Sequence, residues 1–341
     1  MPKTMQALVW HGNGDLRMED VPVPQIGAKE VLVKVQYAGI CATDQEIFNG
    51  QYPFPAKYIL GHEISGTIDK VGAGVEHLQE GDRVVINPAI PCEACSACRS
   101  GRSEFCRHYR ELGINEDGGW AQFVKVPARC AYLIPDALSD RSAAVIEPLV
   151  CPFGAVHAAG VENGDHVLVI GDGPAAMYFV QIARMMGAAS VSVSYKLDSR
   201  IPALKQCGAA YFAESGHIQE LADTKAYRAH GGFDLVIDAV GYSETIQQAI
   251  AMVRVGGRII LYGLKEAESK AFPHKEVVLK NLTVYGRTNA PTLWNKVLES
   301  IENGFLSIDF IPDRVVYPHE VPELLAKPQW PWVKCVVKWN D

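Results

Sequence analysis

The stretch that decides the fold is HVLVIGDGPAA, residues 166–176. Its first five residues form a short apolar run, as expected for a strand buried on both faces, and a helical stretch over 175–186 follows the glycines. The glycines allow a tight turn and let the backbone approach a pyrophosphate at the N-terminus of that helix. The pattern G-x-G-x-x-A between a strand and a helix therefore predicts a dinucleotide-binding turn, with contacts from Gly171, Gly173, Pro174 and Ala175.

Further apolar runs alternate with helical stretches beyond this turn. Strands are predicted at residues 191–194, 233–238 and 258–262, and helices at 204–207 and 245–253. The segment 277–284 is interpreted as the last strand of the same sheet. Strands that alternate with helices favour a parallel, doubly wound sheet, so we expect an α/β fold with a dinucleotide-binding domain over 154–291.

The first third of the chain has a different residue pattern. Residues 5–10 and 31–35 have strand composition, and glycines recur at short intervals, which suits an antiparallel, barrel-like domain over 1–153. The tail, 292–341, carries a predicted helix at 293–303 and β-like segments ending at 334–338, and we assign it back to this first domain. A length of 341 residues suits two domains, because single cores stop growing at about 250–300 residues.

Composition narrows the class of protein. Hydrophobic residues make up 48% of the chain, the net charge is -7 and the isoelectric point is about 5.8, so the chain can bury a core and has no basic footprint for nucleic acid or an anionic membrane. No apolar run is long enough to span a bilayer and no signal core is visible. The cysteine count is nine, and their crowding points to metal in a reducing compartment, so we expect a cytoplasmic protein.

The crowded cysteines form the pattern C-x2-C-x2-C-x7-C, made by Cys92, Cys95, Cys98 and Cys106. Tetrahedral zinc needs four thiolates about one point, and these short spacings let one loop supply them. Because four thiolates leave no open position, the pattern predicts a structural zinc site. Free buried cysteines and an iron–sulfur cluster are the alternatives, although the fourth spacing and the missing proline argue against the cluster. The acidic chain argues against a DNA-binding finger.

A second set of potential ligands consists of Cys41, His62, Glu63 and Glu147. A thiolate, an imidazole and a carboxylate make a mixed zinc set that leaves room for water or substrate. Spacing alone is weak support, because a lone cysteine or an isolated His-Glu pair is more often part of the core or the surface.

The order of these motifs resembles the zinc-containing medium-chain dehydrogenases over nearly the whole chain. The resemblance rests on Cys-x-Thr-Asp at 41–44, Gly-His-Glu at 61–63, Gly-Asp-Arg-Val at 81–84, the cysteine lobe, Glu-Pro-Leu at 147–149 and the glycine turn. It implies a GroES-like catalytic domain, a Rossmann cofactor domain and a homodimer or homotetramer. Gly-His-Glu with Glu-Pro-Leu is most similar to the polyol and threonine branch, which implies Cys41, His62 and either Glu63 or Glu147 as catalytic zinc ligands.

The resemblance also implies a reaction. Zinc would ease loss of the proton from a substrate hydroxyl, and the resulting alkoxide would transfer a hydride to the nicotinamide. Thr43 matches the hydroxyl that accepts the proton first, although a turn-capping threonine is the alternative. Relatives often carry a histidine three residues later, where this chain has Glu46, so Glu46 relays the proton or the outlet lies elsewhere.

The end of the second strand bears on the choice of cofactor. Enzymes that use NAD usually place Asp or Glu there to hold the ribose 2′-hydroxyl, and the resemblance puts Tyr195 in that slot. Without the carboxylate a 2′-phosphate meets no repulsion, and Ser194, Lys196 and Arg200 offer donors. We predict NADP in preference to NAD. The alternatives are that Lys196 and Arg200 form a solvated basic surface and that Asp198 reaches a ribose hydroxyl.

The substrate is expected to be a small polar alcohol, held in a cleft between the domains. A secondary hydroxyl of a polyol or sugar derivative is the leading interpretation, and oxidation of an amino alcohol, as by L-threonine dehydrogenase, is the alternative. A non-catalytic dinucleotide-binding regulator would be expected to lose the metal ligands, which this chain retains. Other residues considered for the substrate pocket are Phe48, Tyr52, Trp120, Arg287 and Asn289.

Overall fold

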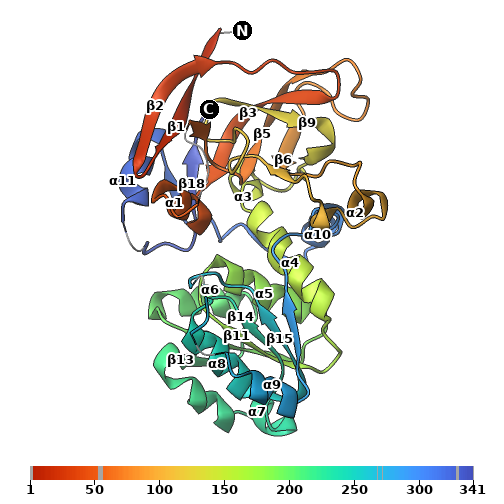
Figure 1. The fold of residues 1–341 in the computed structure, drawn as a ribbon, viewed down its shortest axis with the longest axis vertical. Helices are drawn as coiled ribbons and strands as arrows, with labels where there is room; N and C mark the ends of the chain where they lie inside the picture. Colours follow the sequence, from red (N-terminus) through yellow and green to blue (C-terminus); the bar gives the residue numbers. More distant parts are fainter. Residues whose placement is uncertain (1–2, 53–56, 267, 271, 328–329, 341) are drawn as a thin grey trace. The chain divides into compact units, whose positions relative to one another are not determined.

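The computed structural model describes all residues except 1–2, 53–56, 267, 271, 328–329 and 341, and it divides into two compact units (Figure 1). Unit 1 comprises Met1–Pro148 and Ile308–Asp341, and unit 2 comprises Leu149–Ser307. The C-terminal segment from Ile308 onward therefore belongs with the N-terminal unit. Helix α10 (Trp294–Glu302) lies in unit 2, whereas the boundary expected at 291/292 assigned it to the C-terminal return.

Unit 1 is rich in β-structure, most of it antiparallel. A seven-stranded sheet has the order β10-β6-β5-β3-β18-β17, with β9 also paired to β3, and smaller sheets have the orders β2-β1-β4 and β7-β8. Apolar side chains of β1, β3, β5 and β9 share one buried core. The strands are β1 (Thr4–Gly12), β2 (Asp15–Pro22), β3 (Glu30–Gly39), β4 (Tyr58–Ile59), β5 (Ile64–Val71), β6 (Arg83–Ile86), β7 (Ala89–Ile90), β8 (Arg110–Glu111), β9 (Phe123–Pro127), β10 (Ala131–Leu133), β17 (Arg314–Val316) and β18 (Cys335–Lys338).

Short helices connect these strands. Two of them matter for the sites described below, since α1 starts directly after Cys41 and α2 carries Cys98. The helices of unit 1 are α1 (Ala42–Phe48), α2 (Ser96–Arg99), α3 (Asp140–Ala143) and α11 (Val321–Leu325), with 3-10 turns η1 (Ser103–Phe105), η2 (Ala128–Cys130) and η5 (Pro318–Glu320).

Unit 2 contains a six-stranded sheet in the order β13-β12-β11-β14-β15-β16, in which every neighbouring pair is parallel. This topology confirms the predicted doubly wound α/β fold. Its central strands are apolar because helices cover both faces, and every residue of β14 is buried. The strands are β11 (His166–Ile170), β12 (Ser190–Tyr195), β13 (Tyr211–Glu214), β14 (Phe233–Asp238), β15 (Val253–Leu261) and β16 (Thr283–Gly286).

Helix α4 begins in unit 1 and continues into unit 2, and the other helices around the six-stranded sheet lie within unit 2. Their bounds are α4 (Glu147–Ala159), α5 (Pro174–Met185), α6 (Ile201–Gln206), α7 (Lys225–His230), α8 (Ser243–Met252), α9 (His274–Leu279) and α10, with 3-10 segments η3 (Asp198–Arg200) and η4 (Ser215–Asp223).

The strand predicted at 277–284 is wrong over its first half. Helix α9 ends at Leu279, and the strand β16 starts only at Thr283. The β-branched run at Val277 and Val278 favoured a strand, but the left-handed backbone of Asn281 (φ 53°) breaks the segment in two. The expected helix end at Val253 is also wrong, because that residue starts β15.

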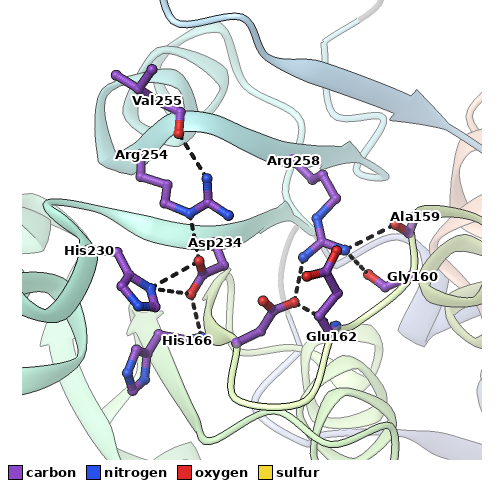
Figure 2. A network of polar contacts seen from close by, with 10 residues as sticks. Ala159, Gly160, Glu162, His166, His230, Asp234, Arg254, Val255 and Arg258 are labelled. Atoms are coloured by element: carbon purple, nitrogen blue, oxygen red, sulfur yellow. Dashed lines mark hydrogen bonds and ion pairs between the residues drawn. The ribbon is translucent and has the colours of Figure 1, made fainter.

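A network of charged side chains joins the amino ends of three parallel strands (Figure 2). The buried carboxylate of Asp234 accepts hydrogen bonds from the His166 amide at 2.8 Å, from Arg254 Nε at 2.6 Å and from His230 Nδ1 at 3.1 Å. Arg258 of β15 pairs with Asp165, the residue before β11. The network ties together β11, β14 and β15 at the end opposite to the glycine turn.

Among the helices that the structure describes, none combines the length and the apolar character needed to cross a membrane.

Candidate active site

The four cysteines of the lobe converge on one point. Cys95 Sγ lies 3.5 Å from Cys98 Sγ, and Cys92 Sγ lies 4.0 Å from Cys98 Sγ. Tetrahedral zinc with arms of about 2.3 Å would space sulfurs about 3.8 Å apart, so these separations fit it. The ligand atoms of Cys92, Cys95, Cys98 and Cys106 all lie within 4.8 Å of one another.

The backbone of the lobe favours thiolates. Amide groups of Cys98 and Arg107 donate to the Cys95 sulfur and lower the pKa of Cys95 to about 6, and amides of Ala94 and Cys95 lower the pKa of Cys92. Burial, together with the adjacent cysteine sulfurs, raises the pKa of Cys98 to about 12 in the absence of a metal. Four close cysteine sulfurs that accept hydrogen bonds from backbone amides are a suitable ligand set for a structural zinc ion.

Cys41, His62 and Glu63 form a second cluster, within unit 1. One ligand atom from each lies within 4.8 Å of those of the other two. Cys41 directly precedes α1, and His62 and Glu63 directly precede β5. The starts of these two elements therefore bring the three side chains together. His62 is 5% exposed and Glu63 is fully buried.

Two glycines make room for this cluster. A Cβ on Gly39 would lie 1.7 Å from Glu63 Oε2, so no larger residue fits beside that carboxylate. Gly61 has the left-handed φ of 88°, and a Cβ there would lie 2.3 Å from the ring of Trp120. Trp120 is itself buried, and its Nε1 donates to the Gly39 carbonyl at 3.2 Å, so this side chain supports the site from the core.

Asp44 orients two of the potential ligands. Its Oδ2 accepts a hydrogen bond from the Cys41 amide at 2.8 Å, and its Oδ1 lies 3.5 Å from His62 Nδ1. Burial alone would lower the pKa of His62, but Asp44 and the Cys41 sulfur together hold that pKa well above its ordinary value. A carboxylate behind a ligand imidazole is the usual outer partner of a zinc-binding histidine.

Lys334 is a member of the site that the sequence did not predict. Its Nζ donates to Glu63 Oε1 at 2.5 Å, and both side chains are buried. Glu63 Oε2 has no hydrogen-bond partner within the described part of the chain. An orphaned carboxylate oxygen beside a thiolate and an imidazole fits a bound cation, because a buried anionic oxygen without a partner is costly. The signal available in the sequence was a lysine among apolar residues just before the last strand.

Glu147 is not one of the three clustered ligands, although it interacts electrostatically with His62 and Glu63. It begins α4 and is partly buried. Burial, reinforced by the carboxylates of Glu63 and Glu111, raises the pKa of Glu147 to about 8 against the opposing influence of His62 and Lys334. Glu111 was also not predicted, and burial raises its pKa while the charge of His62 lowers it.

The residues proposed for proton transfer stand around Cys41. Thr43 Oγ1 lies 3.8 Å from Cys41 Sγ. Burial raises the pKa of Tyr52, and the neighbouring carboxylate of Glu46 raises it further through its charge and a hydrogen bond. Phe48 is a buried core residue, so a substrate-lining role does not follow for it.

In unit 2 the glycine turn has the backbone that dinucleotides require. Gly171 follows β11 with a φ of 124°, and Gly173 precedes α5, whose first residue is Pro174. Proline suits this first helical position, because an N–H there would have no partner within the helix and the ring fixes φ near the helical value. The N-terminus of this twelve-residue helix is therefore a suitable phosphate site.

The residues at the end of β12 differ in their surroundings. Ser194 is 1% exposed and its hydroxyl makes no hydrogen bond among the described residues. Tyr195 packs edge-on against Phe212 with ring centroids 6.4 Å apart, and Lys196 is exposed. Arg200 Nη1 lies 3.2 Å from Asp172, a partner that the sequence did not predict.

Arg287 and Asn289 are the two remaining candidates for the substrate pocket. They lie in unit 2 after β16, and Arg287 Nε donates to the Asn289 carbonyl at 3.4 Å.

Comparison with known proteins identifies the family. Residues 27–136 match the alcohol dehydrogenase GroES-like domain, and residues 175–303 match the zinc-binding dehydrogenase domain. The chain is 30% identical to sorbitol dehydrogenase of Bacillus subtilis (strain 168) over 90% of this chain and 88% of that protein. It is 33% identical to L-threonine 3-dehydrogenase of Anaeromyxobacter sp. (strain Fw109-5) over 93% of each.

A solved structure agrees over the whole chain. The zinc-binding dehydrogenase from Sinorhizobium meliloti 1021, bound to NADP, superposes with a TM-score of 0.93 at 29% identity and covers 99% of this chain and 100% of that one. The chain belongs to the zinc-containing medium-chain dehydrogenase/reductase family, in the branch that resembles polyol and threonine dehydrogenases. It is accordingly an enzyme, a zinc-dependent alcohol dehydrogenase that uses a nicotinamide cofactor.

Proposed function

We propose that this enzyme oxidises a secondary hydroxyl of a polyol or sugar-derived substrate, reversibly, with NADP as the preferred cofactor. The observation that carries the proposal is the cluster of Cys41, His62 and Glu63, in which the buried Glu63 Oε2 has no partner within the described residues. Cys41, His62 and a glutamate, Glu63 or Glu147, would hold the catalytic zinc. The four lobe cysteines would hold a second, structural zinc.

Two residues of unit 1, Thr43 and Glu46, would then carry the proton away from the substrate. When bound, zinc lowers the pKa of the substrate hydroxyl and the nicotinamide accepts the hydride. Thr43, beside Cys41, would accept the hydroxyl proton first. Glu46 would pass it on, and the contact of Glu46 with Tyr52 supports this role, because it places a second hydroxyl next to the carboxylate. Asp44 and Lys334 would hold the ligands rather than the substrate.

The preference for NADP is supported by the charge at the end of β12. Tyr195 occupies the position that usually carries the ribose-binding carboxylate, and Lys196 is exposed next to it. Lys196 could pair with a 2′-phosphate there. Partial burial and the nearby carboxylates of Asp198 and Glu214 raise the pKa of Tyr195, and these carboxylates oppose that pairing. NAD remains the second cofactor, because Arg200 is paired with Asp172 and contributes no net charge while that pair is intact.

An amino alcohol is the second candidate substrate, and one observation favours it. Glu111, Glu147 and Glu46 all lie near the metal cluster, whereas the charge of Lys334 is neutralised by Glu63. When these carboxyl groups are ionised, which for Glu147 requires a pH above about 8, they would attract a substrate ammonium group and repel sugar acids or sugar phosphates. A neutral polyol is compatible with the same surroundings.

A substrate panel tests the proposal. The purified enzyme would be assayed with sorbitol and other polyols, L-threonine, sugar acids and simple primary alcohols, each with NADP⁺ and NAD⁺. We expect the highest kcat/KM on a polyol with NADP⁺. The highest value on L-threonine would select the second candidate, and a tenfold bias to NAD⁺ would refute the cofactor preference.

We also propose a homo-oligomer, a homodimer or homotetramer, in the reducing cytoplasm. Strand β16 pairs only with β15 among the described residues and so is an open edge of its sheet, with Val284 exposed. Val278 and Leu279 of the preceding α9 are 70% and 65% exposed. An uncharged open edge invites a second copy. Light scattering that gave a monomer at micromolar concentration would contradict this, and the lobe thiolates support a reducing compartment.

A further inference from the structure

Asp172, the residue between the two glycines of the cofactor turn, joins that turn to the segment after β12. Its Oδ2 accepts hydrogen bonds from the amides of Lys196 and Leu197, at 2.8 Å each. Its Oδ1 lies 3.2 Å from Arg200 Nη1. The carboxylate is 12% exposed and the guanidinium 14%, so both groups are largely shielded from water.

The same contacts fix the position of Arg200. A Cβ built on Gly173 would lie 3.9 Å from Arg200 Nη1, so the guanidinium stands beside the second glycine of the turn. That glycine precedes the N-terminus of α5, where phosphate groups of a dinucleotide are expected. Arg200 is thus within reach of the cofactor while its charge is held by Asp172.

We propose that Asp172 is a positioning residue that sets the choice between NADP and NAD, an inference that rests on the proposed dehydrogenase function. The two hydrogen bonds that its carboxylate accepts from backbone amides hold residues 196–200 against the glycine turn. The negative charge of Asp172 balances that of Arg200, so the pair adds no net positive charge at the end of β12, where Lys196 is exposed. Asp172 therefore limits the preference for the 2′-phosphate while keeping the segment in place.

Two substitutions separate these roles. Asp172→Asn keeps a side-chain oxygen for the two amides but removes the charge, so Arg200 is released toward the cofactor. Asp172→Ala removes both, so the segment loosens. The matched control is Glu214→Gln, because the exposed Glu214 lies opposite Tyr195 in β13. This substitution removes a carboxylate near the same strand end while leaving Asp172 and its hydrogen bonds to the Lys196 and Leu197 amides in place.

The readout is equilibrium binding of NADPH and of NADH, followed by the fluorescence of the reduced nicotinamide, with no substrate present. We expect Asp172→Asn to tighten NADPH binding and so raise the affinity ratio of NADPH to NADH roughly tenfold, with the affinity for NADH little changed. We expect Asp172→Ala to weaken both cofactors, and Glu214→Gln to leave the ratio within about twofold of the wild type. Thermal unfolding of each variant would establish that it is folded.

Two outcomes would overturn the inference. If Asp172→Asn shifted the ratio no more than Glu214→Gln, the carboxylate would not govern Arg200. If Asp172→Asn weakened NADH selectively, Asp172 would be a direct acceptor for the ribose hydroxyl rather than a positioning residue. Because binding requires no turnover, a failed substrate proposal would leave this result readable. A wild type that favoured NADH would refute only the proposed NADP preference, since the shift caused by Asp172→Asn is measured relative to it.

Discussion

Lys334 and Glu63 show how a single ion pair shapes the metal cluster. Both side chains are buried, and the lysine donates to one carboxylate oxygen while the other has no hydrogen-bond partner among the described residues. Burial alone would lower the pKa of Lys334, but Glu63 and the nearby Cys41 and Asp44 raise it overall, so the lysine stays charged. The pair neutralises one negative charge in a site that already contains the Cys41 sulfur and further carboxyl groups.

Removing the lysine charge should expose that balance. Lys334→Met leaves the Glu63 anion buried without its partner, which costs about 3 kcal/mol in the zinc-stripped protein. Bound zinc should recover part of this loss, because the cation then faces an unpaired carboxylate. Denaturant unfolding of stripped and zinc-loaded protein measures both effects, with Lys334→Arg as the charge-preserving control. A stripped Lys334→Met protein as stable as the wild type would contradict the assigned pairing.

Cysteines from the two clusters should behave differently when they are replaced. Cys41→Ala should reduce turnover at least about a thousandfold while leaving the fold and NADPH binding largely intact, because it removes a ligand at an open site. Cys95→Ala should instead lower thermal stability, since a structural zinc contributes folding free energy. Activity assays, NADPH fluorescence and melting curves of both variants make the comparison. Full activity in Cys41→Ala would rule out the assigned site.

At the scale of single residues, contacts between residues close in sequence were predictable, and contacts between residues far apart in sequence were not. The lobe cysteines are close in sequence, so their convergence followed from the pattern alone. Lys334 and Glu63 are 271 positions apart, and Asp172 meets its amide partners 24 and 25 positions away. Such partners depend on how whole strands are placed, which no local pattern specifies.

At the scale of elements, the charged network of Figure 2 anchors the amino ends of β11, β14 and β15. Burial alone would raise the pKa of Asp234, but the His166 amide, Arg254 and His230 together hold it below its ordinary value. The folded protein therefore favours the ionised carboxylate. This contribution to stability is complete above the unfolded pKa of about 3.9 and is lost as the pH falls through the lower folded pKa.

Asp234→Asn should remove this contribution. We expect a loss of about 2–3 kcal/mol at neutral pH, because the buried carboxylate that pairs with Arg254 and accepts from the His166 amide is removed. The variant should also lose less stability than the wild type as the pH drops below about 4, since the group that titrates is gone. Denaturant unfolding between acidic and neutral pH makes the comparison. Parallel pH profiles for the two proteins would show that Asp234 does not contribute as described.

Elements were predictable where burial alone dictates them. The strands β11 and β14 are buried on both faces, and their apolar runs revealed them. Helix α9 was mistaken for strand because contacts from elsewhere decide its end. Lys280 donates to the main-chain carbonyls of Ile250, Ala251 and Val253, at 2.8 Å, 3.1 Å and 3.1 Å, and so fixes the turn into β16. Tertiary contacts of this kind override strand propensity.

At the scale of the whole molecule, each chemical task belongs to one unit. Unit 1 contains both proposed metal clusters, and unit 2 contains the glycine turn and the end of β12. The parallel sheet and the order of motifs were accessible from the sequence, because periodicity and glycine placement are local properties. The surroundings of the metal cluster were not, since side chains such as Glu111, whose carboxyl interacts electrostatically with His62, come from distant positions in the sequence.

The central claim is that a zinc ion held by Cys41, His62 and a glutamate is required for turnover. The most direct measurement is the zinc content and the NADP⁺-linked activity of one preparation before chelation, after partial chelation and after zinc is returned. We predict about two zinc ions per chain, loss of activity with removal of about one, and recovery on its return. Undiminished activity in protein that retains only the zinc of the cysteine lobe would contradict the account.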